Sequence, residues 1–485
     1  MKNNYKIKNQ NRTKIVATVG PSSSSIHVLE SMIANGCSVF RINFSHGSHE
    51  SHGESIANIR SAAANLEQNV AILGDLQGPK IRIGAIIGEK IDLLAGQELL
   101  LDSDIDDELG SLNGVSYRCD TLAESCGPGR ILMLDDGRVQ LEVISVDRNA
   151  ILTKVLVGTK LSSRKGLNLK GGGLAEDALT EKDKRDMTFA AGQDLDFMCV
   201  SFPCRAQDML DARIMLDQIG CSSKLIAKLE RAEVVESQET IDQMINSCDG
   251  VMVARGDLAV EVGFESVTSI QKQIIQRART LNKPVIVATQ MMESMIESPV
   301  PTRAEVSDVA NAVFDNADAV MLSAETAVGD YAIEVIKTVY DVIIATEKNA
   351  LTQVSKHRVE NNFEYVDESI AMAAMYLSNH FKSIKAIVCL TESGSTALWM
   401  SRIKTHLPLV AMSPKESTRN LVALYKGVRP AALPEGSERQ TQINDVIEFV
   451  KKSVQLQSGD YVALTFGDHV GVDGNTNTLK ILRID

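Results

Sequence analysis

The strongest constraint on the fold is a short apolar run that recurs eight times before residue 323. These runs have the length and β-branched content of buried strands, and segments with one apolar helical face separate most of them. Connections between parallel strands are right-handed, so eight such units close most naturally into a ring. The repeat predicts an α/β fold, a (β/α)₈ TIM barrel. The predicted strands are residues 14–19, 38–42, 70–73, 195–200, 224–229, 250–254, 284–288 and 317–322.

Charged residues close two neighbouring strands in the stretch 224–261. Lys228 and Glu230 end the first strand, and Arg255 and Asp257 follow the second. Two carboxylates beside a lysine at adjacent parallel-strand ends suit a divalent ion that faces a phosphorylated or enolised ligand. These residues alone leave a second interpretation open, a salt-bridge cluster that caps the sheet.

One segment interrupts the barrel pattern. Residues 84–173 show little helical signal, and a hairpin is indicated where Asp136–Gly137 joins two alternating strands. We expect a small inserted β-barrel domain after the third barrel strand, with the glycines at 171–173 as a hinge. At the active rim of a barrel it would act as a lid that excludes water; an inert insertion is the alternative.

A third α/β unit follows a polar linker. A helix is predicted to start near Asp367, and strands are predicted at residues 386–390, 409–411, 427–430, 461–465 and 479–482. The length of 485 residues agrees with about three domains. The expected boundaries are 1–83 and 174–348 for the catalytic barrel, 84–173 for the lid, and 349–485 for a C-terminal regulatory domain.

Composition narrows the functional class. The net charge of −13 argues against broad binding of nucleic acid or of anionic membranes. The basic opening segment lacks an apolar core, and no apolar stretch approaches the ~20 residues of a membrane span. The eight cysteines form no CxxC pair. They indicate reduced thiols in a cytoplasmic protein.

Polar residues follow the predicted strands throughout the barrel. The carboxyl ends of barrel strands carry the chemistry in this fold. Basic residues there suit phosphate or carboxylate groups, and acidic residues suit a divalent metal. The series is Arg41, Asn43, Ser45, Asp75, Ser201, Lys228, Glu230, Asp257, Thr289, Gln290, Ser323 and Glu325.

Long ordered blocks of the chain resemble pyruvate kinases. They include TKIVATVGPSS, FRINFSHGS, LGDLQGPKIRIG, AKLERAE, MVARGDLAVE, VATQMMESM, PTRAEVSDVANAV and MLSAETAVGDY. The resemblance covers nearly the whole chain, the lid and C-terminal domain included. It implies the glycolytic transfer of phosphate from phosphoenolpyruvate to ADP, giving pyruvate and ATP, with Mg²⁺ as the ion and Mn²⁺ as an alternative. Positioning and charge neutralisation dominate such chemistry.

The resemblance also assigns roles to individual residues. The metal ligands fall on Glu230 and Asp257, and the catalytic lysine falls on Lys228. Arg41 matches an arginine that contacts phosphate, and Thr289 is similar to the proton-relay residue, with a water as the immediate donor. Further expected contacts are Ala254, Arg255, Gly256, Asp257 and Ser323 with substrate, and Arg41, Arg82 and Lys165 with nucleotide.

One departure from the family pattern concerns potassium. Many relatives hold K⁺ with an asparagine, a serine, an aspartate and a threonine carbonyl. This chain keeps the first three of these residues, as Asn43, Ser45 and Asp75, but Leu76 replaces the threonine. In addition, Lys80 occupies a position that is glutamate in potassium-dependent members. An ammonium group can supply the missing charge. We therefore expect an enzyme that works without K⁺.

A Ser/Thr/Gly loop opens a predicted helix in the C-terminal domain. Such loops present backbone donors and hydroxyls to phosphate, although these residues also simply cap helices. Within the family the loop resembles the effector site, and the chain resembles the bacterial branch activated by AMP or sugar monophosphates. A homotetramer is expected by the same resemblance. Two alternatives are another phosphoenolpyruvate-using barrel and a non-catalytic metabolite sensor. The loop residues are Thr391, Ser393, Gly394, Ser395 and Thr396.

Overall fold

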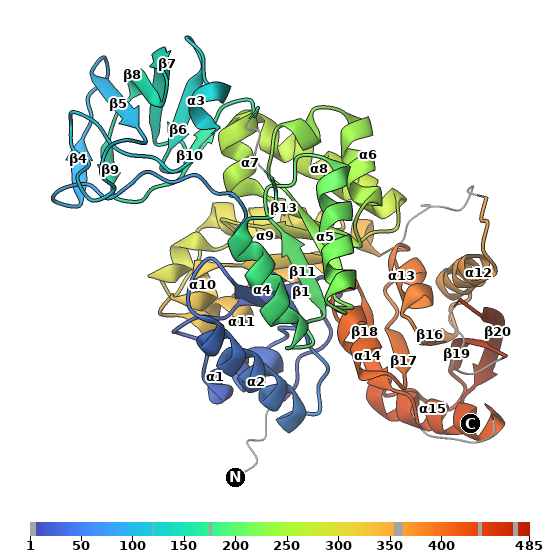
Figure 1. The fold of residues 1–485 in the computed structure, drawn as a ribbon. Coiled ribbons are helices and arrows are strands. Elements are labelled where there is room, and N and C mark those ends of the chain that lie inside the picture. Colours follow the sequence, from blue (N-terminus) through green and yellow to red (C-terminus); the bar gives the residue numbers. More distant parts are fainter. Residues whose placement is uncertain (1–5, 120, 174–176, 354–361, 435–438, 469–473) are drawn as a thin grey trace.

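The computed structural model shows a central barrel with one domain at its upper edge and another at its side (Figure 1). It describes residues 6–119, 121–173, 177–353, 362–434, 439–468 and 474–485. In that part of the chain no helix is both long enough and apolar enough to cross a membrane.

The predicted barrel is confirmed. Eight parallel strands close in the order β1-β15-β14-β13-β12-β11-β3-β2. All eight are almost wholly buried, which explains their continuous apolar sequences. The first strand pairs with the last, with Lys14 opposite Ala319. The strands are β1 (Lys14–Thr18), β2 (Val39–Asn43), β3 (Ala71–Asp75), β11 (Phe197–Val200), β12 (Lys224–Leu229), β13 (Gly250–Ala254), β14 (Val285–Ala288) and β15 (Ala319–Leu322).

Helices cover the outside of the barrel. A capping box starts α9, because the Thr302 hydroxyl accepts from the backbone N–H of Glu305. The helices are α1 (Ile26–Ala34), α2 (His49–Asn65), α4 (Glu181–Ala191), α5 (Ala206–Gln218), α6 (Gln238–Asn246), α8 (Phe264–Thr280), α9 (Arg303–Phe314) and α11 (Ala332–Glu347), with shorter turns η1 (Glu233–Val235), η2 (Glu293–Ile296), α10 (Ala324–Ala327) and η3 (Ala350–Thr352).

One further helix, α7 (Arg255–Val262), starts directly after β13. The sequence indicated only a strand end there. Its first turn holds Arg255, Gly256 and Asp257, so the expected substrate contacts form a helix N-terminus.

The inserted β domain is also present. Its hairpin joins β6 to β7 through Asp135, Asp136 and Gly137, all with positive φ. The described strands form a five-stranded antiparallel sheet and a separate two-stranded ribbon. The elements are β4 (Lys90–Asp92), β5 (Glu98–Asp102), α3 (Leu122–Ser125), β6 (Ile131–Leu134), β7 (Val139–Asp147), β8 (Ala150–Val157), β9 (Lys160–Ser162) and β10 (Leu167–Leu169).

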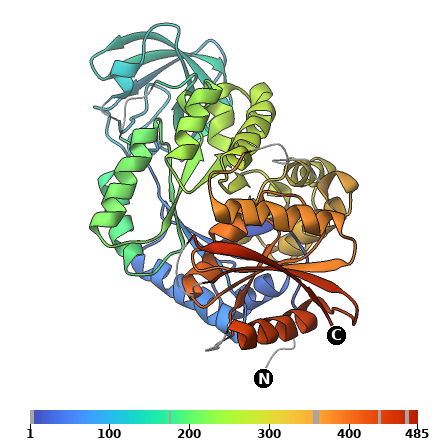
Figure 2. The same ribbon diagram turned by 90° about the vertical axis from the view of Figure 1, so that its right-hand side faces the viewer.

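The C-terminal domain is a five-stranded sheet between helices (Figure 2). Alternate residues of β16 pack into different apolar clusters, one with α12 and one with α15. The last strand, β20, runs antiparallel to its neighbour. The elements are α12 (Val366–His380), β16 (Ile384–Leu390), α13 (Ser395–Ser401), β17 (Leu409–Ser413), α14 (Glu416–Val422), β18 (Val428–Ala432), α15 (Arg439–Val454), β19 (Tyr461–Gly467) and β20 (Thr476–Arg483).

A buried ion pair, a hydrogen bond and apolar contacts hold this domain against the amino-terminal end of the barrel. The guanidinium of Arg402, after α13, pairs with Asp318 before β15, and each side chain is 1% exposed. Lys14 Nζ donates to the carbonyl of Val428 at 2.5 Å. The two domains therefore share buried charges as well as apolar contacts.

Candidate active site

A chain of charged side chains crosses the carboxyl end of the barrel from β2 to β12. Arg41 Nε donates to Asp75 Oδ2 at 2.6 Å, and Asp75 Oδ1 lies 3.5 Å from Lys228 Nζ. The Lys228 ammonium donates to Ser201 Oγ at 2.7 Å. The ring brings these four residues together because they stand at the ends of adjacent strands.

Electrostatic interactions keep Asp75 and Lys228 ionised. Burial alone would raise the pKa of Asp75, but Lys228 and Arg41 bring it below its ordinary value. Burial alone would lower the pKa of Lys228, but Asp75 and Glu230 raise it above its ordinary value. The lysine therefore carries a positive charge at neutral pH.

Glu230 has one carboxylate oxygen available for a further ligand. It is fully buried, and its Oε1 accepts from the backbone N–H of Phe202 at 2.8 Å. Oε2 lies 3.5 Å from Lys228 Nζ but has no hydrogen-bond partner. Burial raises the pKa of Glu230, and Lys228 only partly opposes this shift. A buried carboxylate oxygen without a partner is the observation that fits a divalent cation.

Asp257, in the first turn of α7, is close enough to interact electrostatically with Glu230 and Lys228. Its Oδ1 accepts from Lys80 Nζ at 2.8 Å. Lys80 and Lys228 both approach the ring of Phe202, at 5.9 and 6.0 Å from its centroid. In the described residues no three His, Cys, Asp or Glu side chains form a metal-binding group. Mg²⁺ commonly takes only one or two carboxylates and completes its shell with water and substrate oxygens, so the pair is sufficient.

Thr289 follows β14 in a backbone conformation that is unusual for its type. Its φ is +70°, and that of the next residue, Gln290, is +54°. The Thr289 hydroxyl accepts from Gly256 N–H at 2.8 Å and donates to the Ala288 carbonyl at 2.6 Å. Left-handed residues of this kind concentrate at functional sites. These contacts bring the hydroxyl to the N-terminus of α7.

The side chain of Arg255, in the first turn of α7, makes contacts within the protein. Its guanidinium donates to the carbonyls of Ala288 and Thr289 and pairs with Asp308 at 2.6 Å. The side chain thus holds the end of β14, so only its backbone is available to a ligand. Ser323, also predicted to bind substrate, donates its backbone N–H to Glu325 Oε2 at 2.6 Å.

Two predicted nucleotide contacts, Lys165 in the lid and Arg82 at its edge, lie close to Lys80. Arg82 Nη1 donates to the carbonyl of Arg164 at 3.1 Å, and Lys165 pairs with Asp135 at 2.8 Å. A Cβ placed on Gly166 would lie 3.1 Å from Lys80 Cε. The loop that carries Lys165, between β9 and β10, therefore borders the barrel site, although the Lys165 amine is engaged within the lid.

The predicted remnant of the potassium site is arranged around Asp75. Asn43 stands opposite Asp75 in the β2–β3 register, and its Oδ1 accepts from Ser45 N–H at 3.2 Å. The Leu76 carbonyl accepts from Ser201 Oγ at 2.7 Å. The Lys80 amine contacts Asp257, so the structure places its charge beside the predicted metal ligand.

The predicted effector loop is held by its own hydroxyl groups. Thr391 Oγ1 accepts from Gly394 N–H at 2.9 Å, and the Ser393 and Ser395 hydroxyls are 2.9 Å apart. Thr396 Oγ1 lies 2.8 Å from Thr476 Oγ1, which ties the loop to β20.

Comparison with known proteins identifies the family. The model of the pyruvate kinase barrel domain matches residues 10–336, and that of the pyruvate kinase alpha/beta domain matches residues 368–482. The chain belongs to the pyruvate kinase family. It is similar to pyruvate kinase II of Salmonella typhimurium, with 48% identity over 98% of this chain and 99% of that one. The pyruvate kinase of Haemophilus influenzae is also 48% identical, over 98% and 99%. That of Geobacillus stearothermophilus is 38% identical, over 97% and 80%. The chain is accordingly a phosphotransferase of the pyruvate kinase family.

Ser201 is the site residue that the sequence indicated least clearly. It ends the fourth barrel strand, and its position in the series of polar strand ends was the available signal. The structure shows its hydroxyl between the Lys228 ammonium and the Leu76 carbonyl. These two contacts join strands that are far apart in sequence, so no local motif predicts them.

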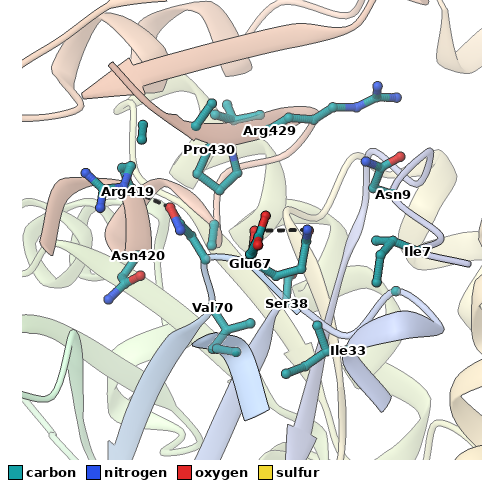
Figure 3. Close-up of a pocket in the computed structure, with 18 of the residues that line it drawn as sticks. Ile7, Asn9, Ile33, Ser38, Glu67, Val70, Arg419, Asn420, Arg429 and Pro430 are labelled. Carbon is teal, nitrogen blue, oxygen red and sulfur yellow. Dashed lines mark hydrogen bonds between the residues drawn. The ribbon is translucent and has the colours of Figure 1, made fainter. Parts of the chain in front are cut away.

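A large cavity lies away from this chemistry. Its volume is about 650 Å³, and it opens between the N-terminal segment, α2 and the C-terminal domain. Figure 3 shows Ile33 and Val70 on the barrel side, facing Arg429 and Pro430 of β18. None of the predicted catalytic, metal or nucleotide residues lines it. This cavity therefore does not mark the candidate active site.

Proposed function

We propose that this chain transfers the phosphoryl group of phosphoenolpyruvate to ADP, giving pyruvate and ATP in glycolysis. The observation that carries the proposal is the position of Lys228 between Asp75 and the unpartnered oxygen of Glu230. The charged ammonium of Lys228, beside a Glu230 oxygen that has no hydrogen-bond partner, suits an anionic group that is bound through a divalent ion.

Each proposed role follows from a contact in the cluster. Glu230 and Asp257 would hold Mg²⁺, with Mn²⁺ as an alternative, and the ion when bound would neutralise charge on the transferred phosphoryl oxygens. Lys228 would stabilise the same group and the enolate. Arg41, fixed by Asp75, would orient phosphate. The Thr289 hydroxyl would support proton delivery to the enolate through a water.

Substrate and nucleotide would meet between the barrel and the lid. Backbone N–H groups around Gly256 and Asp257, with Ser323, would receive the substrate carboxylate. Arg82 and Lys165 would contact ADP phosphates from the lid side. We retain the boundaries 1–83 and 174–348 for the barrel, 84–173 for the lid and 349–485 for the regulatory domain.

The test is pyruvate formation from phosphoenolpyruvate and ADP with Mg²⁺. Lys228→Met should reduce kcat by at least about 10²-fold, the usual effect of removing one group that stabilises transition-state charge. Lys224→Met is the matched control, because that lysine begins the same strand but its side chain is 46% exposed. Turnover by Lys228→Met within a few fold of wild type would contradict the assignment.

We also propose that the enzyme does not require K⁺. The supporting observation is the Lys80 ammonium, which already lies in the anionic cluster. Activity should change less than about twofold when K⁺ is added to a sodium-free tetraalkylammonium buffer, since the fixed charge substitutes for the ion. Lys80→Glu should acquire a K⁺ requirement. A large rate gain for wild type on adding K⁺ would refute this proposal.

The loop containing Thr391, Ser393 and Ser395 is the proposed site for a phosphorylated effector such as AMP or a sugar monophosphate. Ser393→Asp should abolish activation, because a carboxylate repels phosphate, while basal turnover stays unchanged. Retained activation would exclude the loop. We further propose a cytoplasmic homotetramer, which sedimentation analysis would test.

A further inference from the structure

Three consecutive glycines follow β10 at the end of the lid, in a conformation that is difficult for any other residue. Gly171, Gly172 and Gly173 have φ values of +80°, +71° and +96°. A Cβ on Gly172 would lie 2.5 Å from Glu233 Oε1. The segment therefore fits against Glu233 without space for a side chain.

Glu233 binds this segment directly. Its Oε1 accepts from the backbone N–H of Gly173 at 2.5 Å. The carboxylate is itself held by Arg231, whose Nη2 lies 3.0 Å from Oε1. Burial would raise the pKa of Glu233, but Arg231 and the Gly173 N–H bring it below its ordinary value. The anchor is thus a charged group on the barrel, at the start of η1.

Glu261 provides a second attachment. Its backbone carbonyl accepts from Gly171 N–H at 3.0 Å. Its side chain accepts from Ala232 N–H at 2.8 Å and lies 3.3 Å from Arg231 Nε. One arginine therefore connects the two glutamates that contact the glycine segment.

The lid also contributes to this contact. Arg130, immediately before β6, donates through Nη2 to the carbonyl of Gly172 at 2.5 Å. The glycines are thus bonded on one side by the lid and on the other by the barrel. Such a segment has a defined orientation, unlike a free linker.

These attachments join the lid to both segments that carry the proposed metal ligands. Arg231 directly follows Glu230 in sequence. Glu261 belongs to α7, the helix whose first turn contains Asp257. The orientation of the lid is therefore fixed relative to the two segments that present those carboxylates.

We propose that Glu233 is a positioning residue that sets the orientation of the lid relative to the metal-binding carboxylates. The inference rests on the proposed function, because it assumes that Lys165 in the lid and Arg82 at its edge contact the nucleotide. Loss of the anchor leaves the barrel site intact but places the lid contacts incorrectly. The effect falls on ADP, since the proposed phosphoenolpyruvate contacts come from the barrel.

The main test compares Glu233→Ala with Glu236→Ala, in the full-length enzyme. Glu236 ends the same turn and is exposed, so it is the matched control. Glu233→Ala should raise KM for ADP about tenfold, which corresponds to ~1.4 kcal/mol, the scale of one charge-assisted contact. KM for phosphoenolpyruvate should change less than about twofold. An equal rise in both KM values, or no rise, would overturn the proposal.

A second measurement does not need turnover. Amide hydrogen exchange at Gly171–Gly173 and in β10 should accelerate at least about tenfold in Glu233→Ala and remain at the wild-type rate in Glu236→Ala. Unchanged exchange would exclude the anchor even if the enzyme were inactive on these substrates. Failure of pyruvate formation by wild type would instead reject the proposed function and leave the anchor standing.

A steric variant gives an independent check. Gly172→Ala introduces the Cβ that would collide with Glu233, so it should raise KM for ADP and speed exchange at the hinge. In a Glu233→Ala background the collision is absent, and the same change should add less to either measurement. Full additivity of the two substitutions would show that the residues do not act through this contact.

Discussion

Lys14 gives the most quantitative prediction, because its amine is buried between the barrel and the C-terminal domain. The residue is 6% exposed, and its Nζ donates to the Val428 carbonyl at 2.5 Å. Burial, with a contribution from Arg429, lowers the pKa of Lys14 from 10.5 to about 8. The folded protein therefore binds this proton less tightly than the unfolded chain does.

The direction of the pH effect follows from that difference. Between the folded and unfolded pKa values, the unfolded chain retains a proton that the folded protein has released. The free energy of unfolding should then increase with pH by up to ~1.4 kcal/mol per unit. Below the pKa of the folded state, Lys14 is protonated in both states. Its buried charge then lowers the free energy of unfolding by roughly 3 kcal/mol.

Lys14→Met should remove both effects. At about pH 7 the variant should be roughly 2 kcal/mol more stable, because the relieved charge outweighs one lost hydrogen bond of ~1 kcal/mol. Between about pH 8 and about pH 9.5, the free energy of unfolding of wild type should rise by roughly 2 kcal/mol relative to that of the variant. Urea unfolding at about pH 8 and about pH 9.5 measures this difference. Lys6→Met is the control, because Lys6 is exposed. Parallel pH profiles for wild type and Lys14→Met would refute the reasoning.

Two further substitutions test other contacts by unfolding measurements. Arg402→Met should cost about 3–5 kcal/mol, because it removes the guanidinium that pairs with the buried carboxylate of Asp318, and Asp318→Leu in the same chain should restore most of the loss. A single-variant cost below about 1 kcal/mol would contradict this. Thr302→Ala should cost about 1 kcal/mol by removing the cap of α9, and an unchanged thermal midpoint would show that Glu305 suffices alone.

The barrel could be predicted because its strands are buried on both faces and carry their signal locally. The ranges 224–229 and 250–254 are observed as β12 and β13 with the same bounds. Other strand ends differ by one or two residues, as expected where pairing and not composition decides the last residue. The Asp136–Gly137 turn was equally local, because its backbone conformation needs those residue types.

Contacts between distant segments could not be predicted in this way. Helix α7 was missed because Arg255, Gly256 and Asp257 were interpreted as the polar end of the preceding strand, and a helix of eight residues is too short to show a clear helical period. Lys80 was expected to replace a monovalent ion, and nothing near it in sequence indicated its contact with Asp257. The unpartnered oxygen of Glu230 likewise depends on Phe202 occupying the other one.

Closure of the barrel through its first and last strands has a consequence for biosynthesis. Lys14 is paired with Ala319, so β1 lacks one neighbour until more than 300 further residues have left the ribosome. An apolar edge that waits this long is open to wrong partners, including a second nascent chain. We expect the growing polypeptide to depend on holding chaperones until β15 arrives, and truncations before that strand to aggregate.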